Sequence, residues 1–449
     1  MPMPLLLEPA FLTAQAAPPA LSGSDTAWML VATALVLLMT PGLAFFYGGL
    51  VRSKNALNTM MMSFASLGVV GLAWAIAGYS LAFGEGNGAI GGFGHLFLRG
   101  VDLAAKGSIP HVLFMAYQGT FAVITAALIS GAIVERMRFG PYLAFITLWS
   151  LAVYAPVAHW VWGGGWLAGL GALDFAGGTV VHVNAGIAAL VAAATLGARR
   201  DYGRQALLPH NVPFVLLGTA LLWFGWFGFN AGSALAANAS AALAFVNTML
   251  APMATLSVWM LLDRSRTGKF TAVGAATGIV VGLVAITPAA GYVSPMGAIL
   301  LGGVSALPSY FGILWRSRTR LDDSLDVVAA HGLGGLTGAL LTGVLASAAW
   351  GGTAGLVEGN PAQLGRQAIA VLATLGWSGV VSWGLIKAVS FVSALRAEPR
   401  GEGRGLDVEL HGEEAYGSGE GAILVLSESR PASAAPVVNL SHLAGTSGS

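Results

Sequence analysis

Long apolar segments recur along the whole chain and alternate with short polar segments that hold most of the charged residues. Each apolar segment holds about twenty residues, the length that an α-helix needs to cross the ~30 Å hydrocarbon core of a bilayer. Glycine and proline inside these segments are compatible with membrane helices, because neighbouring helices satisfy the freed backbone groups. The pattern predicts eleven spans, near residues 26–50, 56–83, 111–134, 140–160, 175–197, 211–230, 240–262, 271–289, 293–315, 325–349 and 367–395.

The composition supports the same interpretation. Of the 449 residues, 56% are hydrophobic and only 9% are charged, and the mean hydropathy is +0.74. A soluble domain of this length would carry more charge on its surface. We therefore predict an all-α, polytopic membrane protein with a membrane domain over 26–396, an N-terminal segment over 1–25 and a tail over 397–449.

The charged residues and the missing cysteines exclude several classes of function. A net charge of +1 provides no basic surface for nucleic acid. The absence of cysteine excludes disulfides, thiol catalysis and cysteine metal ligands. In the N-terminal segment, Ala14-Gln15-Ala16 resembles the cleavage site of a signal peptide, but the residues before it lack Lys and Arg and include Glu8 and Pro9. Both a cleaved and a retained N-terminal segment stay open.

Lys and Arg residues are distributed unevenly between the two sets of loops. The loops after odd-numbered spans hold thirteen of them, and the loops after even-numbered spans hold three, Arg99, Lys106 and Arg366. Basic residues concentrate in the cytoplasmic loops of membrane proteins. We therefore expect a protein of the plasma (inner) membrane whose N-terminus lies outside and whose tail lies in the cytoplasm, which requires an odd number of spans.

One histidine lies in the middle of the fifth span and another in the tenth. His182 follows Asp174 by eight residues, about 12 Å along a helix, and His331 follows Asp323 by the same number. Because five spans separate the two helices, they run antiparallel and their histidines enter from opposite faces. This arrangement indicates two inverted five-helix repeats followed by an eleventh helix, with both histidines near the midplane.

Three interpretations of the histidine pair differ in function. A hydrogen bond that only joins two helices is the simplest for a single histidine, but two at matched depth favour the lining of a pathway. A metal site is disfavoured, because further ligands are not found beside either histidine. Since the pathway offers no other charge, the species at the midplane is expected to be small and neutral, and imidazoles can both donate and accept hydrogen bonds to it.

Aromatic side chains gather near the expected outer ends of several spans. Their ring faces attract a small cation by roughly 0.5–2 kcal/mol, and Ser233 nearby is able to accept a hydrogen bond from it. A belt of aromatic residues at the membrane interface is the alternative, and we prefer it for Trp160 and Trp166. Asp174 is interpreted either as a carboxylate for a substrate or as the N-cap of the fifth span, and we favour the cap. The aromatic residues are Phe121, Trp162, Trp226 and Phe229.

Several longer stretches resemble the Amt/Mep/Rh ammonium transporter family, and specifically its bacterial-type Amt branch. The resemblance implies an eleven-span protomer in a homotrimer, with a narrow pore for ammonium or ammonia in each protomer, no enzymatic activity and no cofactor. The stretches run from the first span to the tail and are 38-LMTPGLAFFYGGLVRSKN-55, 116-AYQGTFAVITAALISGAIVERMRF-139, 162-WGGGWLAGLGALDFAGGTVVHVNAG-186, 225-GWFGFNAGSALAANASAALAFVNT-248, 286-ITPAAGYVSP-295 and 405-GLDVELHGEEAYG-417.

The same resemblance implies roles for the residues near the outer end of the pore. By their positions in these motifs, Trp162, Ser233 and Phe121 correspond to an external ammonium recruitment site. Phe121 and Phe229 correspond to a stacked phenyl gate below it. The presence of both Trp162 and Ser233 favours the Amt branch over the Rh branch. Tyr117 stands where many relatives carry Phe, a change that we do not expect to alter the function.

Deeper in the pore, the resemblance implies that His182 and His331 are the twin histidines and that Trp226 lines the pore beside them. Asp174 corresponds to an aspartate with a structural or deprotonation-assisting role. Ammonium would lose a proton on the way in, and ammonia would pass the imidazoles. Transport with and without a separately transferred proton are both compatible with these residues, and potassium would be excluded because it has no proton to lose.

The C-terminal tail is charged and rich in glycine. The charged segment 400–417 would be a solvated linker on its composition alone, but the resemblance implies an ordered segment that responds to a PII-type signal protein. Beyond Ser418 the composition indicates disorder.

Two other functions stay as alternatives. An ammonium sensor on the same scaffold is one alternative, disfavoured because no long signalling segment follows the tail. A channel for a neutral solute is another, and it would require a wider pore than two stacked phenyl rings allow.

Overall fold

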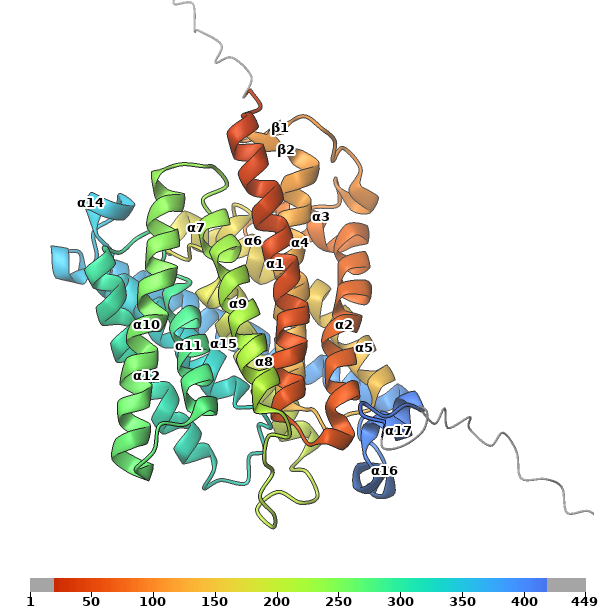
Figure 1. The fold of residues 1–449 in the computed structure, drawn as a ribbon. Helices are drawn as coiled ribbons and strands as arrows, with labels where there is room; N and C mark the ends of the chain where they lie inside the picture. The colour runs from red at the N-terminus through yellow and green to blue at the C-terminus, as the bar shows by residue number, and fades with distance from the viewer. Residues whose placement is uncertain (1–19, 418–449) are drawn as a thin grey trace, which may run out of the picture.

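The chain folds into a bundle of long helices that run between an upper end, where the described chain begins, and a lower end, where the tail lies (Figure 1). The computed structural model describes residues 20–417. The predicted signal-peptide features and the predicted disorder beyond Ser418 therefore lie outside the described residues. Among the described residues, ten helical runs are long and apolar enough to cross a membrane, and the shorter apolar α11 (Ala272–Ile286) is the eleventh helix of the bundle. The predicted all-α fold is confirmed.

Each half of the chain contributes five of these runs. The first half contains α1 (Gly23–Leu50), α2 (Ala56–Ala73) with η2 (Trp74–Gly78) and α3 (Tyr79–Phe83), α4 (His111–Ile129) with η4 (Ser130–Ala132), α5 (Phe139–Trp149) with η5 (Ser150–Tyr154) and α6 (Ala155–Trp162), and η6 (Gly178–Val183) with α8 (Asn184–Leu196). The second half contains α9 (Val212–Gly232), α10 (Ala239–Thr267), α11, α12 (Pro295–Arg316), and η7 (Val328–Leu333) with α13 (Gly334–Leu345).

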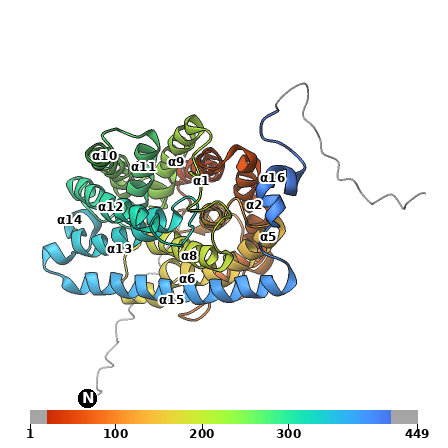
Figure 2. The same ribbon diagram turned by 90° about the horizontal axis from the view of Figure 1, so that it is seen from below.

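The last long helix, α15 (Pro361–Val392), runs along one side of the bundle beside α8 and α13 (Figure 2). It begins six residues before the predicted start at 367, because the first turn is polar and escapes an apolar pattern. Proline at its first position suits a helix start, since that amide has no helical partner. The remaining elements are η1 (Ser53–Asn55), η3 (Leu96–Leu98), β1 (Ala105–Lys106), β2 (Ile109–Pro110), α7 (Trp166–Leu170), α14 (Ala348–Gly351), η8 (Leu356–Glu358), α16 (Pro399–Arg404) and α17 (Leu406–His411).

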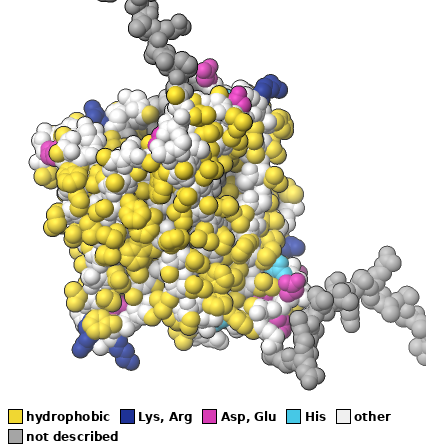
Figure 3. Space-filling view, turned by 45° about the horizontal axis from the view of Figure 1, so that its top comes forward, with side chains coloured by type: hydrophobic (Ala, Val, Ile, Leu, Met, Phe, Trp, Pro, Cys, Tyr) yellow, Lys and Arg dark blue, Asp and Glu magenta, His cyan; other side chains and the backbone are white. Residues whose placement is uncertain are grey.

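Apolar side chains cover the middle of the molecular surface. In Figure 3 they form a continuous yellow region, and the charged side chains lie toward its upper and lower margins. Large side chains such as Phe224 on α9, Leu261 on α10 and Trp383 on α15 are more than half exposed. Such a surface is unsuited to water and suited to lipid tails, as expected of a bundle that spans a membrane.

The equivalent helices of the two halves meet in the bundle core. α1 packs along α9, and the η6–α8 run packs against the η7–α13 run. Both histidine-bearing runs begin with a π-helical turn, η6 and η7, where the sequence pattern predicted regular α-helix. A π-turn inserts one residue without altering the apolar character of the segment, so composition gives no sign of it. Such turns are frequent at functional sites, and here one carries His182 and the other His331.

Glycines allow these two runs to touch backbone to backbone. A Cβ atom on Gly186 would collide with the backbone of Gly332, and one on Gly335 would lie only 2.8 Å from the Cβ atom of His182. Small residues at helix contacts are the usual means by which membrane helices approach closely. The crossing therefore fixes how near the histidine side chains of the two halves can come.

A network of ion pairs joins the connections at the lower end. The carboxylate of Glu135 pairs with Arg52 at 2.9 Å and with Arg199 at 3.0 Å, and Arg199 also pairs with Asp322 at 2.8 Å. Burial raises the pKa of the Glu135 carboxyl, but the charges and hydrogen bonds of Arg199 and Arg52 outweigh it and hold that pKa below its ordinary value. Buried charges of this kind require partners, and these join residues of both halves.

The described part of the tail is attached to the same end. The Asp407 carboxylate accepts hydrogen bonds from the backbone amides of Leu57 at 3.0 Å and Asn58 at 2.8 Å, which belong to the first turn of α2. The Leu406 amide donates to the Asn55 side chain at 2.8 Å, and His411 lies 3.0 Å from the Asn58 side chain. α17 thus caps the N-terminus of α2, which orders a segment whose composition alone would suggest a linker.

We predict that Gly186→Ala destabilises the fold by about 1–3 kcal/mol, because the added methyl group forces the two histidine-bearing runs apart. Gly376→Ala is the matched control, since a Cβ at that position on α15 meets nothing within 4 Å. Reversible unfolding in mixed detergent micelles measures the difference. Equal free energies of unfolding for the two variants would contradict a backbone contact at this crossing.

Candidate functional site

A cavity of about 290 Å³, here called the upper vestibule, opens at the upper end of the bundle. Its lining brings together Trp162 at the end of α6, Phe121 on α4 and Ser233 just after α9, the three residues that the family resemblance groups in one site. The Ser233 hydroxyl donates to the Phe229 carbonyl at 2.8 Å, so its oxygen lone pairs are available to a donor in the vestibule. The remaining lining residues are Phe83, Phe114, Gln118, Val161, Phe175 and Leu235.

Two side chains position this group. The indole nitrogen of Trp162 donates to the backbone carbonyl of Asp174 at 2.9 Å, which fixes the plane of the ring. The Tyr117 hydroxyl lies 3.2 Å from the Ser233 hydroxyl and 2.9 Å from the Phe229 carbonyl. Tyr117 is therefore part of the support of Ser233, a role that its phenol oxygen provides and that phenylalanine would not.

Below the vestibule, the rings of Phe121 and Phe229 lie against each other. Their centroids are 4.2 Å apart and their planes are inclined by 31°, and both side chains are fully buried. The indole of Trp162 meets Phe121 edge to face at 5.9 Å. The two phenyl rings close the floor of the upper vestibule.

The two histidines meet directly beneath these rings. The Nδ1 atoms of His182 and His331 are 3.2 Å apart, and the ring centroids are 5.3 Å apart with planes inclined by 24°. The predicted meeting of the two imidazoles in the core is thereby confirmed. His182 also stacks on Trp226, with centroids 5.4 Å apart, and lies 6.1 Å from the ring of Phe229.

This geometry fixes the hydrogen-bonding character of the pair. A hydrogen bond between two Nδ1 atoms needs one proton, so one ring carries Nδ1–H and the other accepts. If both rings are neutral, the first ring then has a bare Nε2 and the second an Nε2–H. The pair therefore offers one acceptor and one donor to a third molecule. The Nε2 atom of His182 is buried and has no partner among the described residues.

Trp226 is held by a residue that the sequence analysis did not single out. Its indole nitrogen donates to the Thr287 hydroxyl at 2.9 Å, and this hydroxyl donates in turn to the Leu283 carbonyl at 2.8 Å. Thr287 therefore sets the plane of the indole that stacks on His182. Thr287 lies within 286–295, one of the stretches that resemble the transporter family, but nothing in the sequence shows that its hydroxyl reaches α9.

A small cavity of about 10 Å³ lies beside the two histidines, Trp226 and Phe229. That volume holds about one molecule of the size of water. Apart from the two imidazoles and Trp226, its walls are aliphatic side chains and the phenyl rings of Phe46 and Phe229. They are formed by Met39, Leu43, Phe46, Ile124, Leu128, Val181, Leu222, Phe229 and Val280.

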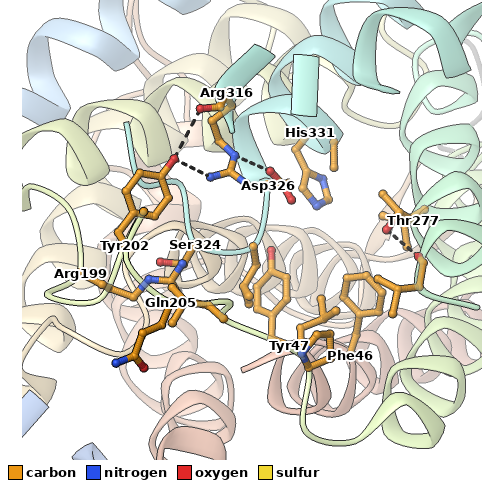
Figure 4. Close-up of a pocket in the computed structure, with 18 residues that line it drawn as sticks. Phe46, Tyr47, Arg199, Tyr202, Gln205, Thr277, Arg316, Ser324, Asp326 and His331 are labelled. Carbon is orange, nitrogen blue, oxygen red and sulfur yellow. Dashed lines mark hydrogen bonds and ion pairs between the residues drawn. The ribbon is translucent and has the colours of Figure 1, made fainter. Parts of the chain in front are cut away.

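His331 also borders a larger cavity of about 330 Å³ at the lower end, here called the lower vestibule (Figure 4). Its polar groups differ in kind from those of the upper vestibule. The Arg316 guanidinium pairs with Asp326 at 2.6 Å and lies 3.4 Å from the Tyr202 hydroxyl. Arg199, which also lines this cavity, is paired with Glu135 and Asp322. The lower vestibule is therefore lined by charged groups that already have partners.

Asp174 lies beside the upper vestibule, but not at the predicted N-cap position. The helical run begins at Gly178 and its N-cap is Gly177, whose φ of +117° only glycine adopts without strain. From three residues upstream, the Asp174 carboxylate accepts hydrogen bonds from the amides of Gly177 at 2.9 Å, Gly178 at 2.5 Å and Thr179 at 2.8 Å, and one from the Thr179 hydroxyl. The capping function is thus performed from the preceding loop.

The second half repeats this arrangement. The Asp323 carboxylate accepts from the amides of Val327 at 3.1 Å and Val328 at 2.7 Å, at the start of the run that carries His331. The equal spacing from aspartate to histidine in the two halves therefore has a structural cause. In each half an aspartate fixes the first turn, and the histidine follows at the same distance along the run.

Comparisons with known proteins agree with this arrangement. Residues 27–416 match the family model described as Ammonium Transporter Family. A relative named "Ammonium transporter" from Aquifex aeolicus is 50% identical over 401 residues, which cover 88% of this chain and 94% of the relative. The crystal structure of Saccharomyces cerevisiae Mep2 matches with a TM-score of 0.80 at 37% identity, over 85% of this chain and 88% of that chain. A structure named "Sensor Amt Protein" matches with a TM-score of 0.81 at 31% identity, over 86% and 98% of the two chains.

We predict that Asp174→Ala lowers the free energy of unfolding by about 1–3 kcal/mol or more, because it leaves several buried amides without an acceptor. Asp174→Asn keeps one acceptor oxygen and is expected to lose less. Glu85→Ala, which removes an exposed carboxylate from the upper end, is the control. Thermal unfolding of the purified variants measures the order, and an Asp174→Ala variant as stable as the control would show that the cap is dispensable.

Proposed function

Because the chain belongs to the ammonium transporter family, we propose that it recruits NH4+ in the upper vestibule and conducts NH3 past the two histidines. Ammonium is its transport substrate, and it acts as an integral multi-pass membrane protein rather than as an enzyme. One observation carries the proposed route. Phe121, Phe229, His182 and His331 form a continuous line of rings between the two vestibules, with successive centroids 4.2, 6.1 and 5.3 Å apart.

The upper vestibule suits a small cation. The ring faces of Trp162 and Phe121 supply an electrostatic attraction, and the Ser233 oxygen supplies a hydrogen-bond acceptor. A cation held there still has most of its surface open to the vestibule, so its dehydration is only partial. Recruitment at this position raises the local concentration of NH4+ directly above the phenyl rings.

The small cavity beside the histidines does not suit an ion. Burying an unpaired charge among hydrocarbon costs far more than the aromatic attraction returns, and a group in such a place changes its protonation state instead. NH4+ meets this condition by losing a proton, whereas K+ has none to lose. The molecule that enters the cavity is therefore NH3.

The histidine pair is suited to this neutral guest. Ammonia donates through its N–H bonds and accepts through its lone pair, and the imidazole pair presents one acceptor and one donor. The bare Nε2 that this arrangement leaves is also able to take up a proton and pass it on. Transport with a separately transferred proton and transport of NH3 alone both fit the pair, and the current carried per molecule distinguishes them.

The orientation follows from the connections at the lower end. We place that end on the cytoplasmic side of the inner membrane, because the loops with thirteen Lys and Arg residues follow the helices that run toward it. The upper vestibule then faces outward. The N-terminus is outside and the tail, with α16 and α17, is cytoplasmic.

We also propose a homotrimer and a PII-type partner at the tail. The resemblance of the chain to its family supports both. The attachment of α17 to α2 through Asp407 supports the second, since it presents an ordered tail beside the lower vestibule. Mass photometry of the purified protein tests the trimer, and interferometry with a purified PII-type protein tests the partner.

The two alternatives receive less support. The structure named as a sensor is 31% identical, against 50% for the Aquifex aeolicus transporter. A channel for urea or glycerol would need more room than the cavity of about 10 Å³ beside the histidines. Ammonium transport therefore remains the function that the site supports best.

Proteoliposomes that contain the protein are expected to take up ¹⁴C-methylammonium, and His182→Leu is expected to reduce the rate about tenfold or more. The leucine removes one of the two imidazoles that offer hydrogen bonds to the permeating base in the dry segment, and the loss of one such bond has this order of size. His95→Gln, on the loop at the upper end, is the control and should retain the rate. Uptake equal to that of empty liposomes by the unmodified protein would refute transport, and full activity of His182→Leu would refute the role of the pair.

A further inference from the structure

A hairpin at the upper end of the bundle carries Lys106 (Figure 1). β1 and β2 pair Lys106 with Ile109, and Gly107 makes the turn with φ +65°. The His111 amide donates to the Ala104 carbonyl at 2.9 Å, which ties the hairpin to the first residue of α4. The backbone that carries Lys106 is therefore held in place on both sides of the residue.

The ammonium group of Lys106 lies over two aromatic rings. Its Nζ atom is 5.1 Å from the ring centroid of Phe114 and 5.8 Å from that of Tyr79. Within residues 20–417 it takes part in none of the ion pairs. Burial lowers the pKa of the Lys106 amine from its ordinary value, whereas the two ring faces favour its charged form.

The same aromatic wall belongs to the upper vestibule. Phe114 lines that cavity together with Phe83 and Phe121, and the rings of Phe83 and Phe114 meet edge to face at 5.1 Å. One ring, Phe114, thus has the cationic end of Lys106 over it and also borders the cavity in which ammonium is recruited. A primary ammonium group, chemically similar to the substrate, is fixed to the wall of the substrate's own site.

We propose that Lys106 is an affinity-determining residue, whose fixed positive charge reduces the occupancy of the upper vestibule by NH4+ and by other small cations. The inference rests on the proposed function. A like charge in the wall opposes each cation that arrives, and the aromatic faces must offset this repulsion before the site fills. The residue therefore sets a higher half-saturating concentration than the aromatic groups alone would give.

A purely structural role for Lys106 leads to a different expectation. If the side chain only packed its methylene stem against Phe114, a neutral residue of similar length would replace it without effect on the affinity. If it stabilised the hairpin through its charge, removal would impair folding and raise the half-saturating concentration. A tighter site after removal of the charge follows only from electrostatic opposition.

The test measures the concentration dependence of ¹⁴C-methylammonium uptake into proteoliposomes at low ionic strength. Lys106→Gln is expected to lower the half-saturating concentration about two- to fivefold with an unchanged maximal rate, and Lys106→Glu is expected to lower it further. Lys106→Arg should match the unmodified protein. About 0.5 M of an impermeant salt should reduce the differences, because it screens exposed charges within a few ångströms.

Arg99→Gln is the matched control. It removes the same charge from the same loop, but from an exposed side chain that makes no cation–π contact among the described residues. It should leave the half-saturating concentration near that of the unmodified protein. Lys106→Met, which keeps the apolar stem, repeats the measurement if Lys106→Gln is produced poorly.

The outcomes separate this inference from the proposed function. No uptake by the unmodified protein would overturn ammonium transport itself. Uptake with the same half-saturating concentration in Lys106→Gln, Lys106→Met and Lys106→Glu would overturn only the role of Lys106. An equal decrease in Arg99→Gln would also overturn it, because the effect would then come from net charge and not from the aromatic wall.

Discussion

The backbone contact between Gly186 and Gly332 is the constraint on which the rest of the structure depends. Only because these residues lack side chains do the two histidine-bearing runs approach closely enough for His182 and His331 to share a proton at 3.2 Å. A wider crossing would separate the imidazoles and admit water between them. The pair would then no longer present one donor and one acceptor in a dry segment, and the proposed discrimination between NH3 and an ion would be lost.

The placement of charge follows from the same dry segment. The ion pairs of the lower end and the amine of Lys106 at the upper end stand at the two ends of the pathway, where water can reach part of them. Asp174 and Asp323 lie deeper, but each is occupied by backbone amides at the start of a helical run. Their charge is used to fix that first turn, so neither of these two carboxylates is left facing the pathway. Asp326, which lines the lower vestibule, is paired with Arg316, and an ion at the midplane therefore finds no free counter-charge among the described residues.

The part of this design that depends on periodicity could be predicted from the sequence. Apolar segment length indicates the helices, and the equal spacing from Asp174 to His182 and from Asp323 to His331 indicates the inverted repeats. The π-turns could not be predicted, because one inserted residue leaves the apolar pattern unchanged. Contacts between distant segments were also hidden. The hydrogen bond from the Trp226 indole to the Thr287 hydroxyl depends on how the two segments are rotated about their axes, and the sequence does not show that rotation.

The two vestibules differ although the repeats are related by symmetry, and this difference favours the binding of a cation at the upper end of the pathway. The upper vestibule offers the open ring faces of Phe121 and Trp162 and the oxygen of Ser233, all suited to a cation. In the lower vestibule, Arg316 and Asp326 are paired with each other, so neither sign of charge is free to hold a ligand there. Binding free energy is therefore concentrated at one end. On the proposed route, a base that passes the histidines reaches a vestibule whose described charged groups are already paired, and water there protonates and releases it.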